Sequence, residues 1–214
     1  MKADFVAPRV KVCGLTREED VASAIEAGAS ALGFVEYPAS PRAVTRERAR
    51  ALIDAVGGRV AAVAVLVDRD PDFAAAWARA SGATMVQLCG SERAEAWRGF
   101  EHPILRRVAA DDRAEEEIAA WQGIASAIVL DHPSAPGGTG LGVDGARAAI
   151  LARLAPCLLA GGLDEANVRA RLLLARPRGA DASSRLEIAP GIKDPARVAA
   201  FVRAAREALQ EIGS

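Results

Sequence analysis

Two residues stand where a strand is expected to end, and both could exchange a proton with a substrate. Cys13 closes the run 10–13, in which apolar and other residues alternate, and Asp131 directly follows the apolar run 127–130. A thiolate can act as a general base, and a carboxyl group as a general acid. The two ends therefore suggest an acid–base pair, provided that the fold brings them to one face.

The side of the first strand on which Cys13 lies follows from the period of a β-strand. Successive side chains alternate, so Lys11 and Cys13 share one face and Val12 takes the other. An ammonium group near a thiol is expected to lower its pKa and to raise the thiolate fraction. A buried cysteine that serves only as a small apolar residue remains the alternative.

Asp131 also has two interpretations. It could cap a turn or a helix, as aspartate often does. Its position after a strand and before the loop 131–142, which holds the run Gly137-Gly138-Thr139-Gly140, favours a role in chemistry. A partly desolvated carboxyl group at such a strand end could hold a raised pKa and donate a proton.

Two later segments suggest an anion site. The paired glycines Gly161 and Gly162 follow an apolar strand and precede an expected helix, so their backbone amides can approach a phosphate closely. Ser183 and Ser184 follow the last expected strand and offer two hydroxyl groups. Paired glycines are often simple turns, but two such segments on neighbouring strands favour a phosphate site.

Arg42 is the best candidate for binding a carboxylate. It lies in a loop stiffened by Pro38 and Pro41, and a guanidinium group can bind a carboxylate through two parallel hydrogen bonds. The alternative is an ordinary solvated arginine, which is expected for most of the others in this chain. The two histidines have no partners at metal-ligand spacing, and we expect no metal and no cofactor.

The elements that must position these residues are eight short apolar runs separated by Ala-rich helical stretches. Eight repeated βα units in 214 residues, without a dividing linker, predict an α/β fold: a single-domain (β/α)8 TIM barrel that spans residues 1–214. In such a barrel, catalytic residues lie at the carboxyl ends of the strands. The predicted strands are 10–13, 31–35, 60–67, 84–88, 104–108, 127–130, 157–159 and 179–182.

Helices are predicted at 18–27, 46–56, 71–80, 145–154, 165–174 and 195–211, and the units after the fourth and fifth strands have no clear helix. Thr16 precedes Glu19 in the pattern of a capping box, whereas Thr45 precedes Arg48, where an acidic residue is preferred. The first of these two helix starts is therefore predicted to be the better capped.

Composition and charge exclude several classes of protein. The 27 basic and 28 acidic residues nearly balance, so no overall field favours nucleic acid or an anionic membrane. No apolar run is long enough to span a bilayer, and the first residues do not resemble a signal peptide. Three widely spaced cysteines fit neither a disulfide framework nor a zinc site. We expect a cytoplasmic protein that is a monomer or a homodimer.

Seven ordered segments resemble the phosphoribosylanthranilate isomerase family of tryptophan biosynthesis, from about residue 11 to residue 202. They are Lys-Val-Cys-Gly-Leu-Thr-Arg at 11–17, Ala-Leu-Gly-Phe-Val at 31–35, Ser-Pro-Arg at 40–42, Val-Gln-Leu at 86–88, Gly-Gly-Thr-Gly at 137–140, Leu-Ala-Gly-Gly-Leu at 159–163 and Ala-Pro-Gly-Ile-Lys-Asp at 189–194.

The resemblance implies a cofactor-free Amadori rearrangement of a small-molecule phosphosugar. By this resemblance, Cys13 is the general base and Asp131 is the general acid. Arg42 matches the arginine that holds the anthranilate carboxylate. The phosphate would be bound by Gly161, Gly162, Ser183 and Ser184.

The chain departs from the family pattern at three positions. Glu36 stands where an apolar residue is common and would repel an anionic substrate if it pointed inwards. Cys89 replaces a familiar histidine. Arg185 replaces a glycine, whose backbone freedom an arginine lacks, although a cation there could assist phosphate binding.

Two other functions remain open from the sequence. Another phosphosugar-converting barrel, such as an aldolase or an epimerase, would share the phosphate segments but would need a Schiff-base lysine or a metal cluster. A catalytically silent paralogue is suggested by the three departures, whereas retention of both Cys13 and Asp131 argues against it.

Overall fold

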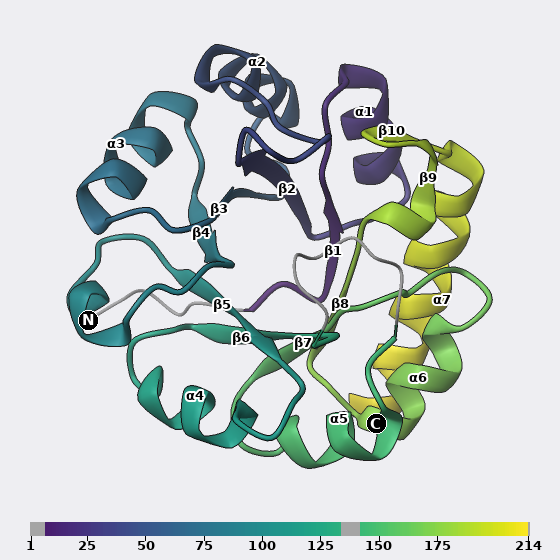
Figure 1. The fold of residues 1–214 in the computed structure, drawn as a ribbon. Helices are drawn as coiled ribbons and strands as arrows, with labels where there is room; N and C mark the ends of the chain where they lie inside the picture. Colours follow the sequence, from purple (N-terminus) through teal and green to yellow (C-terminus); the bar gives the residue numbers. More distant parts are fainter. Residues whose placement is uncertain (1–6, 134–141, 214) are drawn as a thin grey trace.

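The computed structural model describes residues 7–133 and 142–213, and within them eight parallel strands close into a barrel surrounded by helices (Figure 1). Each strand pairs with the next along the chain, and β8 pairs with β1, which confirms the predicted (β/α)8 barrel. The predicted loop run 137–140 lies outside the described residues. The strands are β1 (Val10–Cys13), β2 (Ala31–Glu36), β3 (Ala61–Leu66), β4 (Met85–Leu88), β5 (Ile104–Ala109), β6 (Ala127–Asp131), β7 (Cys157–Leu159) and β8 (Gly179–Ala182).

The helices lie outside the barrel, and the described residues contain seven α-helices. After β4 the chain forms only the short 3-10 helix η1 (Ala94–Trp97), and after β5 it forms a seven-residue helix, which agrees with the weak helical pattern there. The α-helices are α1 (Glu18–Glu26), α2 (Arg46–Val56), α3 (Pro71–Ser81), α4 (Ala114–Ala120), α5 (Gly145–Leu151), α6 (Val168–Ala175) and α7 (Pro195–Gly213).

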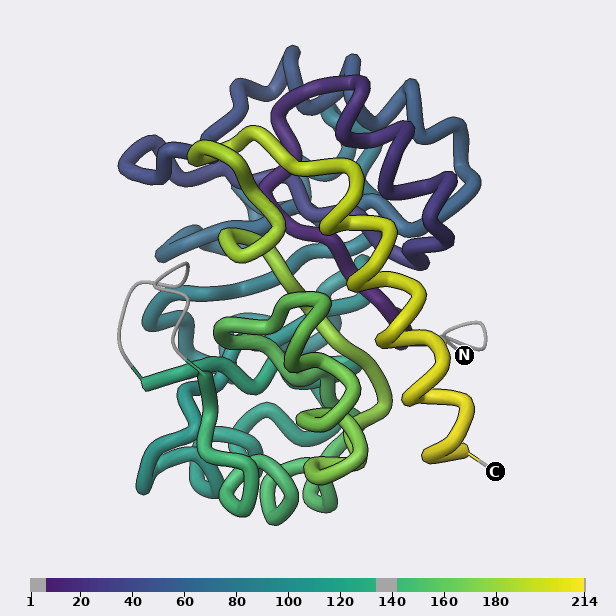
Figure 2. Tube along the Cα trace, turned by 90° about the vertical axis from the view of Figure 1, so that its right-hand side faces the viewer, coloured from purple at the N-terminus to yellow at the C-terminus, as the bar shows by residue number. Residues whose placement is uncertain are grey.

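A small addition follows β8. The 3-10 helix η2 (Ser184–Leu186) leads into an antiparallel pair of short strands, β9 (Glu187–Ala189) and β10 (Ile192–Lys193), which the sequence did not predict. Their hairpin lies beside α1 and leads into α7 (Figure 1). Helix α7 then runs along the flank of the barrel (Figure 2). It buries Val198, Phe201, Val202 and Ala205, whose spacing of three and four residues forms one apolar face.

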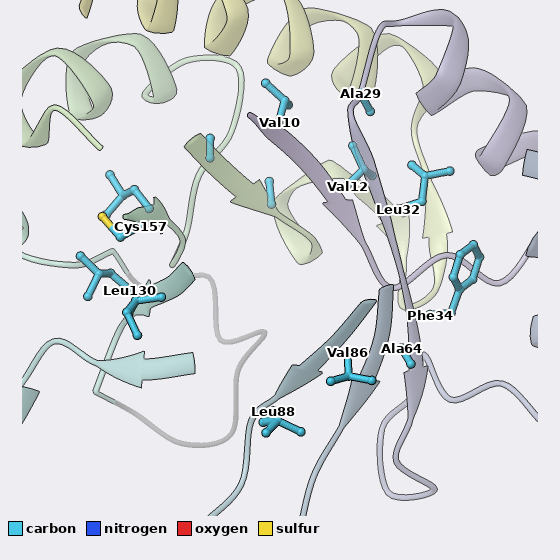
Figure 3. Packing of buried hydrophobic residues seen from close by; sticks show 14 of the residues in the cluster. Val10, Val12, Ala29, Leu32, Phe34, Ala64, Val86, Leu88, Leu130 and Cys157 are labelled. Carbon is cyan, nitrogen blue, oxygen red and sulfur yellow. The ribbon is translucent and has the colours of Figure 1, made fainter. Parts of the chain in front are cut away.

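Period-2 alternation divides the core into two layers. Val12 belongs to the outer layer between strands and helices, together with Leu32 and Phe34 (Figure 3). Cys13 belongs to the inner layer, inside the barrel. The predicted inward direction of Cys13 is therefore confirmed, and the same rule sorts the side chains of every other strand.

The sequence predicted that Thr16 caps its helix better than Thr45 caps the next one, and this prediction is wrong. Thr45 caps α2, because its hydroxyl accepts a hydrogen bond from the backbone N–H of Arg48 at 3.1 Å. Thr16 caps no helix, since α1 begins after Arg17 and the Thr16 hydroxyl donates to the carbonyl of Gly191 at 2.6 Å. A long-range contact to the β9–β10 turn has replaced the local one.

Candidate active site

A cavity of about 530 Å³ opens at the carboxyl ends of the strands, and its lining includes all seven residues that the sequence predicted. They come from five separate parts of the chain, and the closed barrel brings them together. The seven are Cys13, Arg42, Asp131, Gly161, Gly162, Ser183 and Ser184. A larger cavity of about 680 Å³ near the amino end of β1 is lined by no thiol and no carboxylate.

Cys13 ends β1 at the base of the cavity, with only 9% of the residue exposed. Its sulfur lies over Gly33 of β2, where a Cβ atom would approach the sulfur to 2.7 Å, so a glycine is required at that position. Burial raises the pKa of Cys13, and the Lys11 ammonium opposes this effect without cancelling it. The predicted net lowering of the thiol pKa is therefore wrong, because desolvation outweighs the neighbouring charge.

Lys11 and Asp181 form an ion pair inside the barrel. The Lys11 ammonium is fully buried, and its Nζ atom lies 2.9 Å from each carboxylate oxygen of Asp181. Strands β1 and β8 are neighbours, and Lys11 is directly opposite Asp181 in their register. Burial alone would lower the pKa of Lys11, but the charges of Asp181 and Cys13 outweigh burial and raise it. The ammonium therefore stays charged beside the thiol.

Asp131 is the last residue of β6, and both of its carboxylate oxygens have partners. Oδ1 accepts a hydrogen bond from the backbone N–H of His132 at 2.8 Å, and Oδ2 accepts one from Nε of Arg107 at 2.9 Å. Arg107 also lines the cavity. The sequence analysis missed it, although alternation along β5 would have placed Leu105 and Arg107 inside the barrel and Arg106 outside.

Arg42 reaches the cavity but is not free. Its Nε and Nη2 atoms donate to the two carboxylate oxygens of Glu187 at 2.8 and 2.7 Å, and Glu187 also accepts from Lys193 at 2.7 Å. The Arg42 side chain passes directly over Gly14, where a Cβ atom would lie 2.5 Å from Arg42 Cδ. The sequence analysis placed Arg42 correctly but missed Glu187 and Lys193, which come from the unpredicted β9–β10 hairpin.

The paired glycines line the cavity with a backbone that would be strained in a residue with a Cβ atom. Gly161 and Gly162 both have left-handed backbones, with φ of 76° and 62°. Arg171 donates to the carbonyl of Gly161 at 3.0 Å, and Asn167 donates to that of Gly162 at 2.9 Å, so both carbonyls are tied to α6 and its cap. Helix α6 begins at Val168, three residues later than the predicted start at residue 165.

Ser183 and Ser184 follow β8, the strand that pairs with β7, and line the same cavity as these glycines. The Ser183 hydroxyl donates to the carbonyl of Cys13 at 2.9 Å, and Lys193 donates to the Ser183 carbonyl at 3.2 Å. The Ser183 hydroxyl hydrogen therefore already has a partner, and it would have to turn to serve a phosphate. Arg185 lies beside the two serines in the cavity lining.

The departures Glu36 and Cys89 are both accommodated. Glu36 forms an ion pair with Arg69, with N–O distances of 2.8 and 3.1 Å, so its charge is compensated. Cys89 accepts a hydrogen bond from Gln87 Nε2 at 3.3 Å, and burial raises the pKa of its thiol to about 12. Gln87 is 5% exposed, and its Oε1 atom has no partner among the described residues.

No group of three or more His, Cys, Asp or Glu side chains in residues 7–133 and 142–213 is arranged to hold a metal ion. Over the same residues, no helix combines the length and apolar character needed to cross a membrane.

Comparison with known proteins gives one consistent answer. Residues 10–204 match the family model described as N-(5'phosphoribosyl)anthranilate (PRA) isomerase. A relative from Chelativorans sp. (strain BNC1), named N-(5'-phosphoribosyl)anthranilate isomerase, is 38% identical over 209 residues, which cover 93% of this chain and 96% of the relative.

Solved structures agree with the sequence comparison. The phosphoribosyl anthranilate isomerase of Thermotoga maritima superposes with a TM-score of 0.86 at 31% identity, over 94% of this chain and 100% of that one. A PRAI structure in complex with reduced 1-(o-carboxyphenylamino)-1-deoxyribulose 5-phosphate gives a TM-score of 0.83 at 30% identity, with coverages of 94% and 100%. The chain therefore belongs to the N-(5'-phosphoribosyl)anthranilate isomerase family.

Proposed function

We propose that this chain catalyses the Amadori rearrangement of N-(5'-phosphoribosyl)anthranilate to 1-(2-carboxyphenylamino)-1-deoxyribulose 5-phosphate in tryptophan biosynthesis. The observation that carries this proposal is the single cavity of about 530 Å³ in which a thiol, a carboxyl group, an arginine and two anion-binding segments meet. Each of these groups serves one part of the substrate, and no cofactor is needed for proton transfer between them.

The first step belongs to Asp131. Its carboxyl group donates a proton to the ribose ring oxygen while the bond between C1 and that oxygen breaks. The lone pair of the anthranilate nitrogen forms the C1=N bond, which gives an open-chain Schiff base. The position of Asp131 at the end of β6, facing the cavity, supports this role.

Cys13 carries out the second step. Its thiolate removes the proton from C2, the electrons of that C–H bond form the C1=C2 bond of an enolamine, and the π electrons of the C1=N bond return to the nitrogen. The enolamine becomes the ketone when the C2 hydroxyl group loses its proton and C1 gains one. Because burial raises the pKa of Cys13, only a small fraction is thiolate at neutral pH, but that thiolate is a stronger base than an exposed one. The ammonium of Lys11 stabilises its charge.

The remaining residues hold the two ends of the substrate. The amides of Gly161 and Gly162 and the hydroxyl groups of Ser183 and Ser184 bind the phosphate; the left-handed backbones of the two glycines and the presence of all four residues in one cavity lining support this role. Arg42 binds the anthranilate carboxylate. Its bidentate pair with Glu187 fixes the guanidinium plane before the substrate arrives, which lowers the entropic cost of binding.

Two buried lysines bear on the alternative of a Schiff-base aldolase. Lys11 is bound to Asp181, and Lys193 is bound to Glu187 and to the carbonyl of Ser183. A Schiff-base lysine must be a neutral amine with access to the substrate. Neither lysine lines the cavity, so both arrangements favour the isomerase.

We also propose that residues 1–214 form one catalytic domain and that the protein acts in the cytoplasm as a monomer or a homodimer. Light scattering coupled to size-exclusion chromatography distinguishes the two oligomeric states.

The proposed function is tested in a tryptophan auxotroph that lacks the isomerase. The wild-type chain should restore growth without tryptophan, and Cys13→Ala should not. Fluorescence assays on the purified protein then follow consumption of phosphoribosylanthranilate. Failure of the wild-type chain in both tests would contradict the proposed function.

A further inference from the structure

We propose that Arg107 is a positioning residue for the acid: it holds the Asp131 carboxyl group in the orientation in which that group can protonate the ribose ring oxygen. This inference rests on the role proposed above for Asp131. It assigns a task to a residue that no sequence motif indicated.

The contacts of Arg107 fix two consecutive residues at once. Its Nε atom donates to Oδ2 of Asp131 at 2.9 Å, and its Nη2 atom donates to the backbone carbonyl of His132 at 3.0 Å. One rigid guanidinium plane therefore holds the Asp131 side chain and the backbone that follows it. The carboxylate cannot turn about its side-chain torsions without losing this bond.

The register of the barrel explains why Arg107 can reach Asp131. In the β5–β6 pairing, Arg107 is opposite Val129, and Ala109 is opposite Asp131. Arg107 thus lies one inward-facing position below Asp131 on the neighbouring strand, and its long side chain extends towards the carboxyl end. Both side chains are partly exposed to the cavity, 14% for Arg107 and 16% for Asp131.

Of the two consecutive arginines on β5, only Arg107 can position Asp131, because Arg106 lies on the other face of the strand. Arg106 points out of the barrel, where it contacts Glu92 at 2.5 Å and Glu117 at 2.7 Å and lies over the ring of Trp121. It is absent from the cavity lining, whereas Arg107 is part of it. Arg106 joins elements of the scaffold, and Arg107 joins two residues of the site.

Counting lone pairs shows that the contact between Arg107 and Asp131 is compatible with acid catalysis by Asp131. Each carboxyl oxygen has two lone-pair positions. The amide of His132 takes one position on Oδ1, and Arg107 takes one on Oδ2, which leaves one position on each oxygen. The catalytic proton and its path to the substrate are thereby confined to the directions that remain. An acid fixed in this way avoids the rotational search that an unrestrained side chain would need.

The test compares Arg107→Met with Arg79→Met as the matched control. Arg79 also forms an ion pair with a carboxylate, that of Glu101, but it lies outside the cavity lining. We expect Arg107→Met to lower kcat about 10- to 100-fold, because misplacement by about 1 Å can cost about 100-fold. KM and the affinity for reduced 1-(o-carboxyphenylamino)-1-deoxyribulose 5-phosphate should change less than about 3-fold. Arg79→Met should leave all three values unchanged.

A double-mutant cycle separates positioning from a merely structural role. If Arg107 acts through Asp131, Arg107→Met should change kcat less than about 3-fold in an Asp131→Asn background. Arg107→Lys should recover part of the lost turnover, since an ammonium can make one of the two contacts. Should Arg107→Met not fold, the same cycle is run with Arg107→Lys.

Several outcomes would overturn the inference. An unchanged kcat in Arg107→Met, in a protein that loses turnover on Asp131→Asn, would remove the positioning role. A rise in KM with unchanged kcat would make Arg107 a substrate-binding residue instead. Equal losses of kcat from Arg107→Met in the wild-type and Asp131→Asn backgrounds would also contradict the positioning role. Full turnover of Asp131→Asn itself would instead refute the proposed acid.

Discussion

The ammonium of Lys11 lies 2.9 Å from both carboxylate oxygens of Asp181. Lys11 itself is two residues before Cys13 on strand β1. The pair spans the seam where the last strand of the barrel meets the first. It has two consequences. The pair closes the barrel with a buried charge–charge contact, and it fixes a positive charge close to the base.

Replacement of Asp181 by asparagine should destabilise the protein strongly. The Lys11 ammonium would remain buried without its countercharge, and breaking a buried ion pair typically costs about 3–5 kcal/mol. Urea unfolding at pH 7 measures this loss. The control is Asp54→Asn, which removes an exposed pair with Arg50 and should cost less than about 1 kcal/mol. Equal losses in the two variants would show that the buried pair contributes no more than a surface one.

Replacement of Cys13 by serine should leave the fold intact and remove most of the turnover. A hydroxyl group is a far poorer base than a thiolate, and loss of a general base typically costs about 10²- to 10⁴-fold. Steady-state kinetics and a thermal melt check both parts. Cys157→Ala is the control, because Cys157 belongs to the outer core and is absent from the cavity lining. A Cys13→Ser enzyme within a few-fold of the wild type would refute the assignment of the base.

Cys157 should make the stability of the protein depend on alkaline pH. Burial raises the pKa of this thiol to about 12. The unfolded thiol titrates near 9, so between about pH 9 and 12 only the unfolded state has lost the proton. The stabilisation is complete below about pH 9. It is lost as the pH rises, with a slope of about 1.4 kcal/mol per pH unit.

Cys157→Ala should remove that slope, so its free energy of unfolding should fall less steeply than that of the wild type above pH 9. Unfolding in urea at pH 8, 9.5 and 10.5 provides the comparison. Leu159→Val, on the same strand and in the same core layer, should be less stable at every pH but should keep the wild-type slope. Parallel curves for Cys157→Ala and the wild type would contradict the prediction.

The sequence could predict the position of those site residues whose side-chain direction follows from the alternation along a single strand. Cys13 and Asp131 end strands, and the alternation of side chains sends Cys13 into the barrel. The Lys11–Asp181 pair could also be predicted, because a closed barrel makes β1 and β8 neighbours and the two residues lie at matching depths. These inferences need only the strand period and the barrel topology.

The missed residues depend on contacts between separate segments. Arg107 could have been placed inside the barrel, but its bond to Asp131 depends on a two-residue offset between β5 and β6. Glu187 comes from a hairpin whose two strands have three and two residues, too few to show a strand pattern. The Thr16 hydroxyl does not take its expected capping role, because it donates instead to the carbonyl of Gly191, 175 residues away in the chain. Local pattern carries no information about such distant partners.

Replacement of Gly162 by alanine should weaken phosphate binding. Gly162 has a φ of 62°, a left-handed backbone that costs a residue with a Cβ atom about 1–2 kcal/mol. Gly162→Ala should therefore shift the backbone amides away from the phosphate and raise KM, while kcat changes less because the acid and the base stay in place. Inorganic phosphate should inhibit the wild type competitively and this variant more weakly.

Gly58→Ala is the matched control, since Gly58 has a φ of 69° with open space around its Cβ position and lies outside the cavity lining. It carries the same backbone strain and should leave KM and phosphate inhibition unchanged. If both variants raised KM equally, general strain rather than a lost phosphate contact would be the cause. Phosphate bound elsewhere in a crystal, with the amides of Gly161 and Gly162 unoccupied, would place the subsite on another part of the barrel.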